Sequence, residues 1–344
     1  MIVALIDIGS GSVGAGLARV EKGVPPVLFS TTRVAIPFQT ELEGARFESR
    51  MLQALSEAVS ALAQERLPED EVFVSLAAPW VSAQTTHLSL RSEEALTVTP
   101  SLLARLRESE ESERTHGEQI EEKLFRVRLN GYETAAPFGQ GARTAEFALF
   151  KSFTPPGLAG RIEAVIERHL HRGPIHFHAF SLIAFASLRE VAPTVRDFLI
   201  LDAGGEQTEA VVVKNGALRE VVSIPFGRNH LIRALVAGGA LPSVVGSMLR
   251  LLAEGSGAGV HLERTGARLR EALRLWGQEV GRALGETLSA SARLFLFADS
   301  DILPLFAGEL RGRARLTEAD AALFAHPDPF LATQAIVAGL LRKG

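Results

Sequence analysis

Two segments of the chain repeat one order of hydrophobic and polar positions. The first, MIVALIDIGSGSVGAGLARVEKGVPPVLFS, has an apolar run that contains Asp7, a small-residue turn, an alternating run, a second turn and another apolar run. The second, FLILDAGGEQTEAVVVKNGALREVVSIPFG, follows the same order around Asp202. Alternation bounded by glycine turns predicts β-hairpins. A strand that leads into Asp-x-Gly and opens a hairpin, found twice about half a chain apart, indicates an internal duplication.

The glycines of the first segment also match a different fold. Residues 9–14, GSGSVG, fit the G-x-G-x-x-G fingerprint of dinucleotide-binding proteins. That fold needs a helix directly after the turn, whereas Gly16 and Gly23 would each weaken such a helix by about 1 kcal/mol relative to alanine. The acidic residue expected about 20 positions further on is also missing from FSTTRVAIPF. A nicotinamide enzyme therefore stays an alternative that requires a helix from Ala15 onward, and a hairpin at that point excludes it.

Each predicted turn has the chemistry of a phosphate-binding loop. Its free backbone N–H groups suit a phosphate, and Asp7 and Asp202 can each hold Mg²⁺ through water. Two such turns that face each other across a cleft would bind one polyphosphate from both sides. This interpretation requires Asp7 and Asp202 to converge on one cleft.

The paired hairpins resemble those of the actin-like ATPase superfamily, in which D-x-G hairpins form the two phosphate loops. The segment SIPFGRNHLIRALV is similar to the one that follows the second loop in the bacterial cell-division protein FtsA. Gly227, Asn229 and His230 fit its Gly-Gly-Asn-His pattern, whereas Arg228 replaces the second glycine. The pilus-assembly protein PilM shares much of this pattern.

The order of the remaining segments resembles FtsA and PilM over nearly the whole chain. EDEVFVSLAAPW and the later RTAEFALFKSF resemble the small inserted domain of these proteins. The resemblance implies an α/β, actin-like (ribonuclease H-like) two-lobed fold with a small inserted α+β (SHS2-like) domain. The implied divisions are a first lobe over 1–70, completed by 155–195 and a closing helix at 328–344, an insertion over 71–154, and a second lobe over 196–327 with a helical subdomain at about 237–292.

The resemblance also implies a set of nucleotide contacts. The residues that it implies for the phosphates of ATP are Asp7, Gly9, Ser10, Gly11, Ser12, Asp202, Gly204, Gly205, Thr208 and Gly227. Asp7 and Asp202 would also hold Mg²⁺ through water, provided that nucleotide binds.

The chain departs from the family pattern where the chemistry would take place. Residues 298–301, ADSD, stand where the family has a glycine-rich adenosine turn, so that two carboxylates would lie near the ligand without obvious partners. Gly246 falls near an expected Glu, and the helix around Ser181 offers no acid or amide to orient water. Because hydrolysis needs in-line water and metal, we predict no catalytic residue and no efficient ATPase activity. Binding of ATP with Mg²⁺ stays open, because both aspartates remain.

Other polar clusters have simpler explanations. HLHRGPIHFH contains His169, His171, His176 and His178, and an H-x-H pair on a strand can suit zinc. The alternative is a strand edge with solvated histidines. RESEESERTHGEQIEEK reads as a solvated helix face or an interaction surface. GSGAGVHLERTGARLREALRLW lacks the G-K-[ST] ending of a phosphate loop.

Composition narrows the location and the partners. A net charge of −4 without any Lys/Arg block gives no reason to expect nucleic-acid binding, and the absence of cysteine excludes disulfides and thiolate metal sites. No apolar run reaches the roughly 20 residues of a membrane helix. The closing segment FLATQAIVAGLL is apolar all round, which favours burial over a membrane-surface helix, so membrane contact would go through a partner.

We therefore expect a cytoplasmic protein, peripheral at the inner face of the cell membrane. The leading hypothesis is an FtsA-like scaffold of the bacterial division machinery with a degenerate or weak ATP-binding cleft. The alternatives are a PilM-like platform for type IV pilus assembly and, from another class, an active ATPase or phosphotransferase of the actin/sugar-kinase fold. The expected partners are division or pilus membrane proteins, and self-association stays open.

Overall fold

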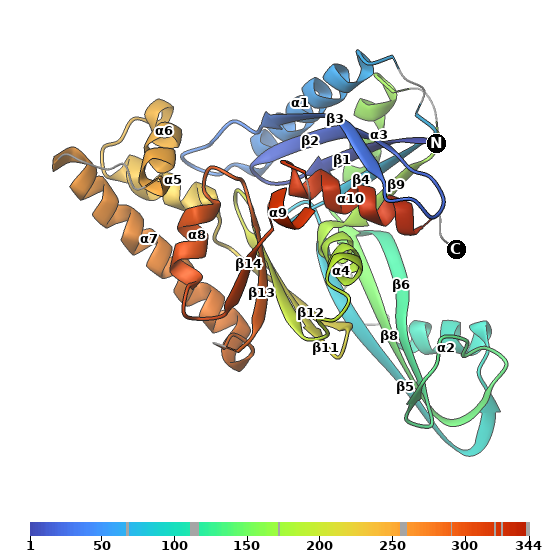
Figure 1. Ribbon diagram of the computed structural model, residues 1–344. Coiled ribbons are helices and arrows are strands. Elements are labelled where there is room, and N and C mark those ends of the chain that lie inside the picture. The colour runs from blue at the N-terminus through green and yellow to red at the C-terminus, as the bar shows by residue number, and fades with distance from the viewer. Residues whose placement is uncertain are drawn as a thin grey trace.

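The first predicted hairpin forms part of a five-stranded sheet in the computed structural model (Figure 1). The structure describes residues 1–66, 69–110, 117–170, 173–254, 260–289, 291–319, 321–324 and 326–341. The sheet has the order β3-β2-β1-β4-β9, with β1 (Ile2–Ile8), β2 (Ser12–Arg19), β3 (Val27–Ala35), β4 (Glu71–Leu76) and β9 (Ile175–Ala179). The first three strands are antiparallel neighbours, and β4 runs parallel to both β1 and β9. Because β2 is a strand where the dinucleotide fold needs a helix, the nicotinamide-enzyme alternative is excluded.

Helices cover this sheet with apolar faces. Helix α1 (Gly44–Ala63) buries Phe47, Met51 and Leu55 at the four-residue spacing of one helix face. Helices α3 (Leu158–Glu167) and α4 (Phe180–Val191) are also part of this lobe. Helix α10 (Pro329–Leu340) packs against α4 and β1 and is buried almost all round, as its composition predicts. No helix of the described residues has both the length and the apolarity to cross a membrane.

The second predicted hairpin forms a second sheet with the same design. Its order is β12-β11-β10-β13-β14, with β10 (Phe198–Ala203), β11 (Thr208–Lys214), β12 (Ala217–Ile224), β13 (Arg293–Ala298) and β14 (Arg315–Glu318). Again three antiparallel strands are followed by two parallel ones. Both sheets therefore carry one strand order and one pattern of directions, as an internal duplication predicts.

The helices of the second lobe are α5 (Arg228–Ala237), α6 (Pro242–Ala253), α7 (Val260–Leu284) and α8 (Leu303–Leu310), with a short 3₁₀ turn, η1 (Gly285–Thr287). A further short helix, α9 (Ala321–Phe324), precedes α10. The side chain of Trp276 on α7 is fully buried against Phe306 of α8, at a ring-centroid distance of 4.4 Å. Figure 1 shows α5, α6, α7 and α8 together on one side of the second sheet.

A third sheet extends away from the two lobes (Figure 1). It has the order β5-β8-β6-β7, with β5 (Ser82–Thr97), β6 (Glu118–Leu129), β7 (Tyr132–Glu133) and β8 (Gly141–Thr154), and it is accompanied by α2 (Pro100–Glu110). Its core packs Leu88, Phe147 and Leu149. Strand β4, which the sequence analysis places in the insertion, pairs with β1 and β9 of the first sheet instead. We therefore propose that the insertion runs from β5 to β8 and begins after Leu76, not at residue 71.

Candidate functional site

The turns of the two duplicated hairpins touch each other. The Ser10 hydroxyl in the first turn accepts a hydrogen bond from the Glu206 backbone N–H in the second, at 2.9 Å. A Cβ atom on Gly205 would lie 2.6 Å from the backbone of Ser10 and Gly11, which is closer than side chains tolerate. Glycine is therefore required at position 205 for the two turns to approach this closely. The predicted convergence of the two hairpins is found.

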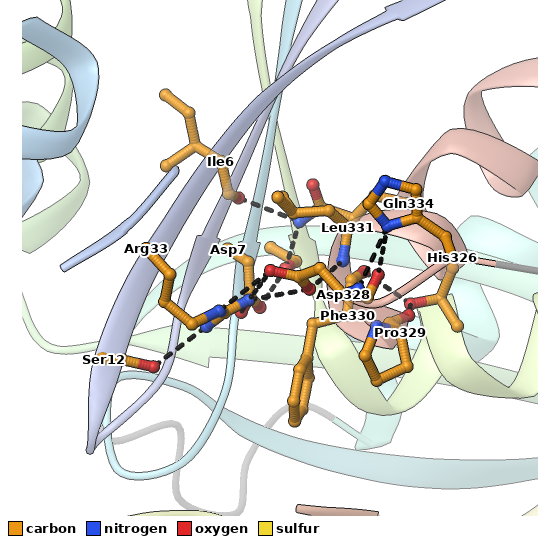
Figure 2. A network of polar contacts seen from close by, with 12 residues as sticks. Ile6, Asp7, Ser12, Arg33, His326, Asp328, Pro329, Phe330, Leu331 and Gln334 are labelled. Carbon is orange, nitrogen blue, oxygen red and sulfur yellow. Dashed lines mark hydrogen bonds and ion pairs between the residues drawn. The ribbon is translucent and has the colours of Figure 1, made fainter. Parts of the chain in front are cut away.

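Arg33, on the edge strand β3 of the same sheet, binds the carboxylate of Asp7 (Figure 2). Arg33 Nη2 lies 3.0 Å from Asp7 Oδ2, and the Ser75 hydroxyl donates to Asp7 Oδ1 at 3.0 Å. Arg33 also donates from Nη1 to the Ser12 hydroxyl at 2.9 Å, and from Nε to Asp328 at 2.9 Å. Asp328 is the N-cap of α10, where its side chain accepts from the Leu331 N–H. One guanidinium thus joins the first hairpin to the start of the closing helix.

The first hairpin leaves room for this guanidinium at a glycine. Gly14 is the cross-strand neighbour of Asp7, and a Cβ atom there would lie 2.6 Å from Arg33 Nη2. Burial raises the pKa of Asp7 to about 6, against the opposing effect of the Arg33 charge. Burial also lowers the pKa of Arg33, but the Asp7 and Asp328 charges outweigh it, so that the pKa is raised and the group stays a cation.

The second hairpin has an acid where the first has this glycine. Glu209 is the cross-strand neighbour of Asp202, as Gly14 is of Asp7. Asp202 Oδ1 and both carboxylate oxygens of Glu209 are buried without a hydrogen-bond partner among the described residues. Burial raises the pKa of Glu209 to about 7, and burial together with the Glu209 charge raises the pKa of Asp202 well above its ordinary value. The two hairpins therefore share one strand register, but the acid of the first hairpin has an arginine partner and the acid of the second lies beside another acid.

Two departures from the family pattern, Arg228 and the acidic turn at residues 298–301, contact each other. Arg228, at the start of α5, donates to Asp299 and to Asp301 at 2.9 Å each. The expectation that these two carboxylates lack obvious partners is therefore wrong. The arginine that replaces the second glycine supplies their counter-charge, because the start of α5 lies beside the turn between β13 and α8.

A cavity of about 590 Å³ opens beside the two turns. Its lining includes Gly11 and Ser12 of the first hairpin together with five charged residues, which are Arg33, Arg228, Asp299, Asp301 and Asp328. Three carboxylates thus face two guanidiniums, and the buried carboxylate of Asp7 lies behind them. The local balance is acidic, which is unfavourable for a polyphosphate.

Glu206 joins the second turn to the first lobe. Arg233 of α5 binds its carboxylate at 2.8 and 2.9 Å, and the amide of Asn229 donates to it at 2.7 Å. The same guanidinium donates to the carbonyl oxygens of Gln39 and Thr40, at 3.1 and 3.2 Å, in the loop between β3 and α1. The contact therefore joins the two lobes directly beside the hairpin turns.

The residues expected to bind nucleotide lie close together but differ in exposure. Gly9 and Gly204 take equivalent places, because each donates its N–H to the carbonyl three residues on, at 3.0 Å. Gly227 approaches the carbonyl oxygen of Gly204 so closely that a Cβ atom would lie 2.4 Å from it. Thr208 is fully buried, and its hydroxyl donates to the Phe226 carbonyl at 2.6 Å and accepts from Trp276 Nε1 at 2.9 Å. Thr208 therefore stabilises the second lobe.

Sequence reasoning missed Arg33, Glu209 and the Glu206–Arg233 pair. Arg33 follows Asp7 by 26 positions and belongs to no motif. The signal in the sequence was Gly14, because a glycine opposite a buried acid leaves room for a large cationic side chain. For Glu209 the signal was an acid inside a strand whose other residues, from Thr208 to Val213, are all buried and mostly apolar.

The histidine-rich segment is divided among different contacts. His178 Nδ1 lies 2.7 Å from Glu121 of the inserted sheet, and His176 Nε2 lies 3.6 Å from Glu71. His169 pairs with the Ser56 hydroxyl at 3.0 Å. The described part of the chain contains no group of three or more His, Cys, Asp or Glu side chains placed to hold a metal. His171, residues 111–116 of the charge run and residues 255–259 of the glycine-rich segment lie outside the described residues.

Solved structures show which fold this arrangement belongs to. No family model matches the sequence, and no curated protein matches it either. A chain of the PilM–PilN type IV pilus biogenesis complex superimposes with a TM-score of 0.62 over 98% of both chains, at 16% identity. The chain has the actin-like fold.

Two other actin-like structures agree with this fold. The diol dehydratase-reactivating factor in nucleotide-free form gives a TM-score of 0.54 over 100% of both chains, at 9% identity. The ethanolamine utilization protein EutJ from Carboxydothermus hydrogenoformans gives 0.50 over 98% of this chain and 89% of that chain, at 12% identity. Identities this low establish the fold alone.

The first hairpin does not fit the hydrated Mg²⁺ that accompanies nucleotide in this fold. Both oxygens of Asp7 are already hydrogen-bonded, one to Ser75 and one to Arg33. A second cation beside the Arg33 guanidinium would be repelled by it. Asp202 differs in this respect, because its buried Oδ1 has no hydrogen-bond partner among the described residues.

Proposed function

We propose that the protein is an actin-like scaffold of the PilM kind, which assembles with a membrane protein of a bacterial pilus machine and does not hydrolyse ATP. The observation that carries the proposal is the ion pair between Arg33 and Asp7 at 3.0 Å, because Asp7 is the residue expected to hold a nucleotide's metal and the ion pair already binds its carboxylate. Similarity to the PilM–PilN complex over 98% of both chains supports the pilus role over the division role.

The geometry of the cleft supports a structural role for it. The two hairpin turns are in van der Waals contact through Gly205 and Gly11, and Arg233 ties the lobes together next to them. Phosphates held between the turns would have to separate them. The acidic turn at Asp299 and Asp301 adds repulsion, because a nucleotide polyphosphate carries several negative charges. Two hairpin turns held in contact in this way suit a rigid platform.

The partner would bring the protein to the inner face of the cell membrane. None of the helices in the described residues is suited to crossing a membrane, and α10 is buried in the first lobe. Under this proposal the protein lies in the cytoplasm and reaches the membrane through the partner.

Affinity capture from the native host, combined with phosphate release from Mg-ATP, tests the proposal. We expect a pilus membrane protein among the captured partners, and phosphate release no faster than in an Asp202→Asn variant. Division proteins in place of pilus proteins would favour the FtsA-like role. Capture of neither, or steady turnover that Asp202→Asn removes, would overturn the proposal.

An active ATPase or phosphotransferase is the second candidate, and Glu209 is the observation that favours it. Its carboxylate is buried near Ser181 of α4, in the region where an orienting acid or amide was expected and not found in the sequence. With a pKa raised to about 7, this group could exchange a proton near neutral pH. If the candidate is right, Glu209→Gln abolishes phosphate release while the affinity for ATP is retained.

A further inference from the structure

We propose that Arg33 is the resident cation of the cleft, standing in for a divalent metal at the first hairpin, so that the wild-type protein has no metal site at Asp7. This inference deepens the proposed function and rests on the same ion pair, but it concerns the metal and not the partner.

Side chains from three elements hold the Arg33 guanidinium in one position. Its three nitrogens donate to side chains of β1, β2 and the α10 cap, at 2.9 to 3.0 Å, through Asp7, Ser12 and Asp328 (Figure 2). The Phe330 ring covers it at 5.1 Å from Cζ to the ring centroid. A planar fork that binds two carboxylates at once is the geometry in which arginine binds most strongly.

Gly14 makes this position available. Any side chain at residue 14 would start 2.6 Å from Arg33 Nη2, so the guanidinium occupies the volume of a missing Cβ. At the equivalent register position of the second hairpin stands Glu209, and no guanidinium is bonded to Asp202 among the described contacts. The cation is therefore a specific feature of the first hairpin and does not follow from the duplicated backbone.

The carboxylates around Arg33 explain how a metal could bind once the guanidinium is removed. Asp7 and Asp328 carry two negative charges, which Arg33 bridges. Removing the guanidinium would leave two carboxylates and the Ser12 hydroxyl around an arginine-sized gap. Oxygen donors of this kind suit Mg²⁺ and Mn²⁺. Loss of one side chain should thus convert an ion-pair network into a metal site.

Electron paramagnetic resonance of added Mn²⁺ tests this inference, because bound Mn²⁺ loses the signal of the free aquo ion. We expect Arg33→Ala to bind Mn²⁺ at least tenfold more tightly than wild type. Asp7→Asn in the Arg33→Ala background should abolish the gain. Arg33→Lys keeps a cation at this position and should behave as wild type. The matched control is Arg19→Ala, which removes an exposed arginine from the neighbouring strand β2 and should gain no site.

Two outcomes would overturn the inference. One is a folded Arg33→Ala protein, judged by circular dichroism, that gains no Mn²⁺ affinity. The other is Mn²⁺ binding by the wild-type protein that Asp7→Asn abolishes. The second measurement needs no change at Arg33, so it decides the question even where Arg33→Ala fails to fold. Neither outcome bears on the pilus partner, which affinity capture tests separately, whereas Mn²⁺ binding at Asp7 of the wild-type protein would also count against the proposed absence of ATP hydrolysis.

Discussion

Glu206 and Arg233 form a two-pronged ion pair at 2.8 and 2.9 Å, and through it the second hairpin is held against the first lobe. Glu206 is almost completely buried, whereas Arg233 is partly exposed. The guanidinium continues across the boundary to the Gln39 and Thr40 carbonyl oxygens. The closed state of the cleft thus depends on one side chain that serves both lobes.

Arg233→Ala should loosen the boundary between the lobes. The substitution leaves the buried Glu206 carboxylate without its cation, which typically costs about 3 kcal/mol when one partner of a buried pair is removed. We expect the free energy of unfolding to fall by about that amount, and small-angle X-ray scattering to report a larger radius of gyration. Urea denaturation measures the first effect.

The control for Arg233→Ala is Arg282→Ala. Arg282 forms an exposed pair with Glu279 on the outside of α7, at 2.8 Å. Such pairs contribute about 0 to 1 kcal/mol. Equal losses of stability in the two variants would contradict the role assigned to Arg233.

Gly205→Ala should separate the two hairpin turns. The new methyl group would lie 2.6 Å from backbone atoms of Ser10 and Gly11, and backbone cannot turn aside as a flexible side chain does. We expect faster hydrogen exchange at the N–H of Glu206, which donates to the Ser10 hydroxyl across this contact.

Gly246→Ala is the matched control for Gly205→Ala. Gly246 lies in α6, where an added Cβ atom meets nothing within 4 Å. The substitution should stabilise the helix by about 1 kcal/mol. A Gly205→Ala protein with unchanged exchange at Glu206 would show that the turns do not touch in solution.

Thr208→Val should weaken the second lobe without affecting any ligand. The hydroxyl bonds both the Phe226 carbonyl and Trp276 Nε1, so valine leaves one buried donor and one partly buried acceptor unpaired. An unpaired buried group costs about 1 to 3 kcal/mol. Thermal unfolding of Thr208→Val, compared with Thr31→Val on the exposed face of β3, measures the difference. A similar melting temperature in both variants would contradict the buried role.

Much of the fold could be predicted from the sequence because its decisive signals are local. The alternation, the glycine turns and the Asp-x-Gly pattern each lie within about 30 residues, and they correctly indicate two hairpins and a duplication. The sheet that β4 joins could not be predicted from the sequence, for a physical reason. A parallel strand buried on both faces is a continuous apolar run, and such a run does not show which sheet it joins.

The candidate site was harder to predict because its charges meet across long stretches of sequence. Arg33 and Asp328 lie 295 residues apart, and Arg228 and Asp299 lie 71 apart. In the sequence, Arg228 and the acidic turn each look like the separate loss of a family motif. Their pairing is visible only when α5 and the β13–α8 turn are brought together.

Two buried acids of the cleft, Glu209 and Asp7, should make the folded protein less stable as the pH rises. Burial raises the pKa of Glu209 from 4.5 to about 7, and that of Asp7 from 3.8 to about 6. An acid with a raised native pKa holds its proton in the folded state after the unfolded chain has released it. Between about pH 4 and 7 these two groups therefore bind more protons in the folded state, and their contribution to the free energy of unfolding falls as the pH rises.

Glu209→Gln should remove the larger part of this effect, because the amide cannot ionise. A difference of 2 to 3 pKa units corresponds to about 3 kcal/mol, so the variant should exceed wild type by roughly that amount above pH 7 and equal it near pH 4.5. Urea denaturation between pH 4.5 and 8 measures both curves, with Glu220→Gln on the exposed edge of β12 as the control. A stability difference between Glu209→Gln and wild type that does not grow as the pH rises would mean that Glu209 is already ionised in the folded protein at the lower pH.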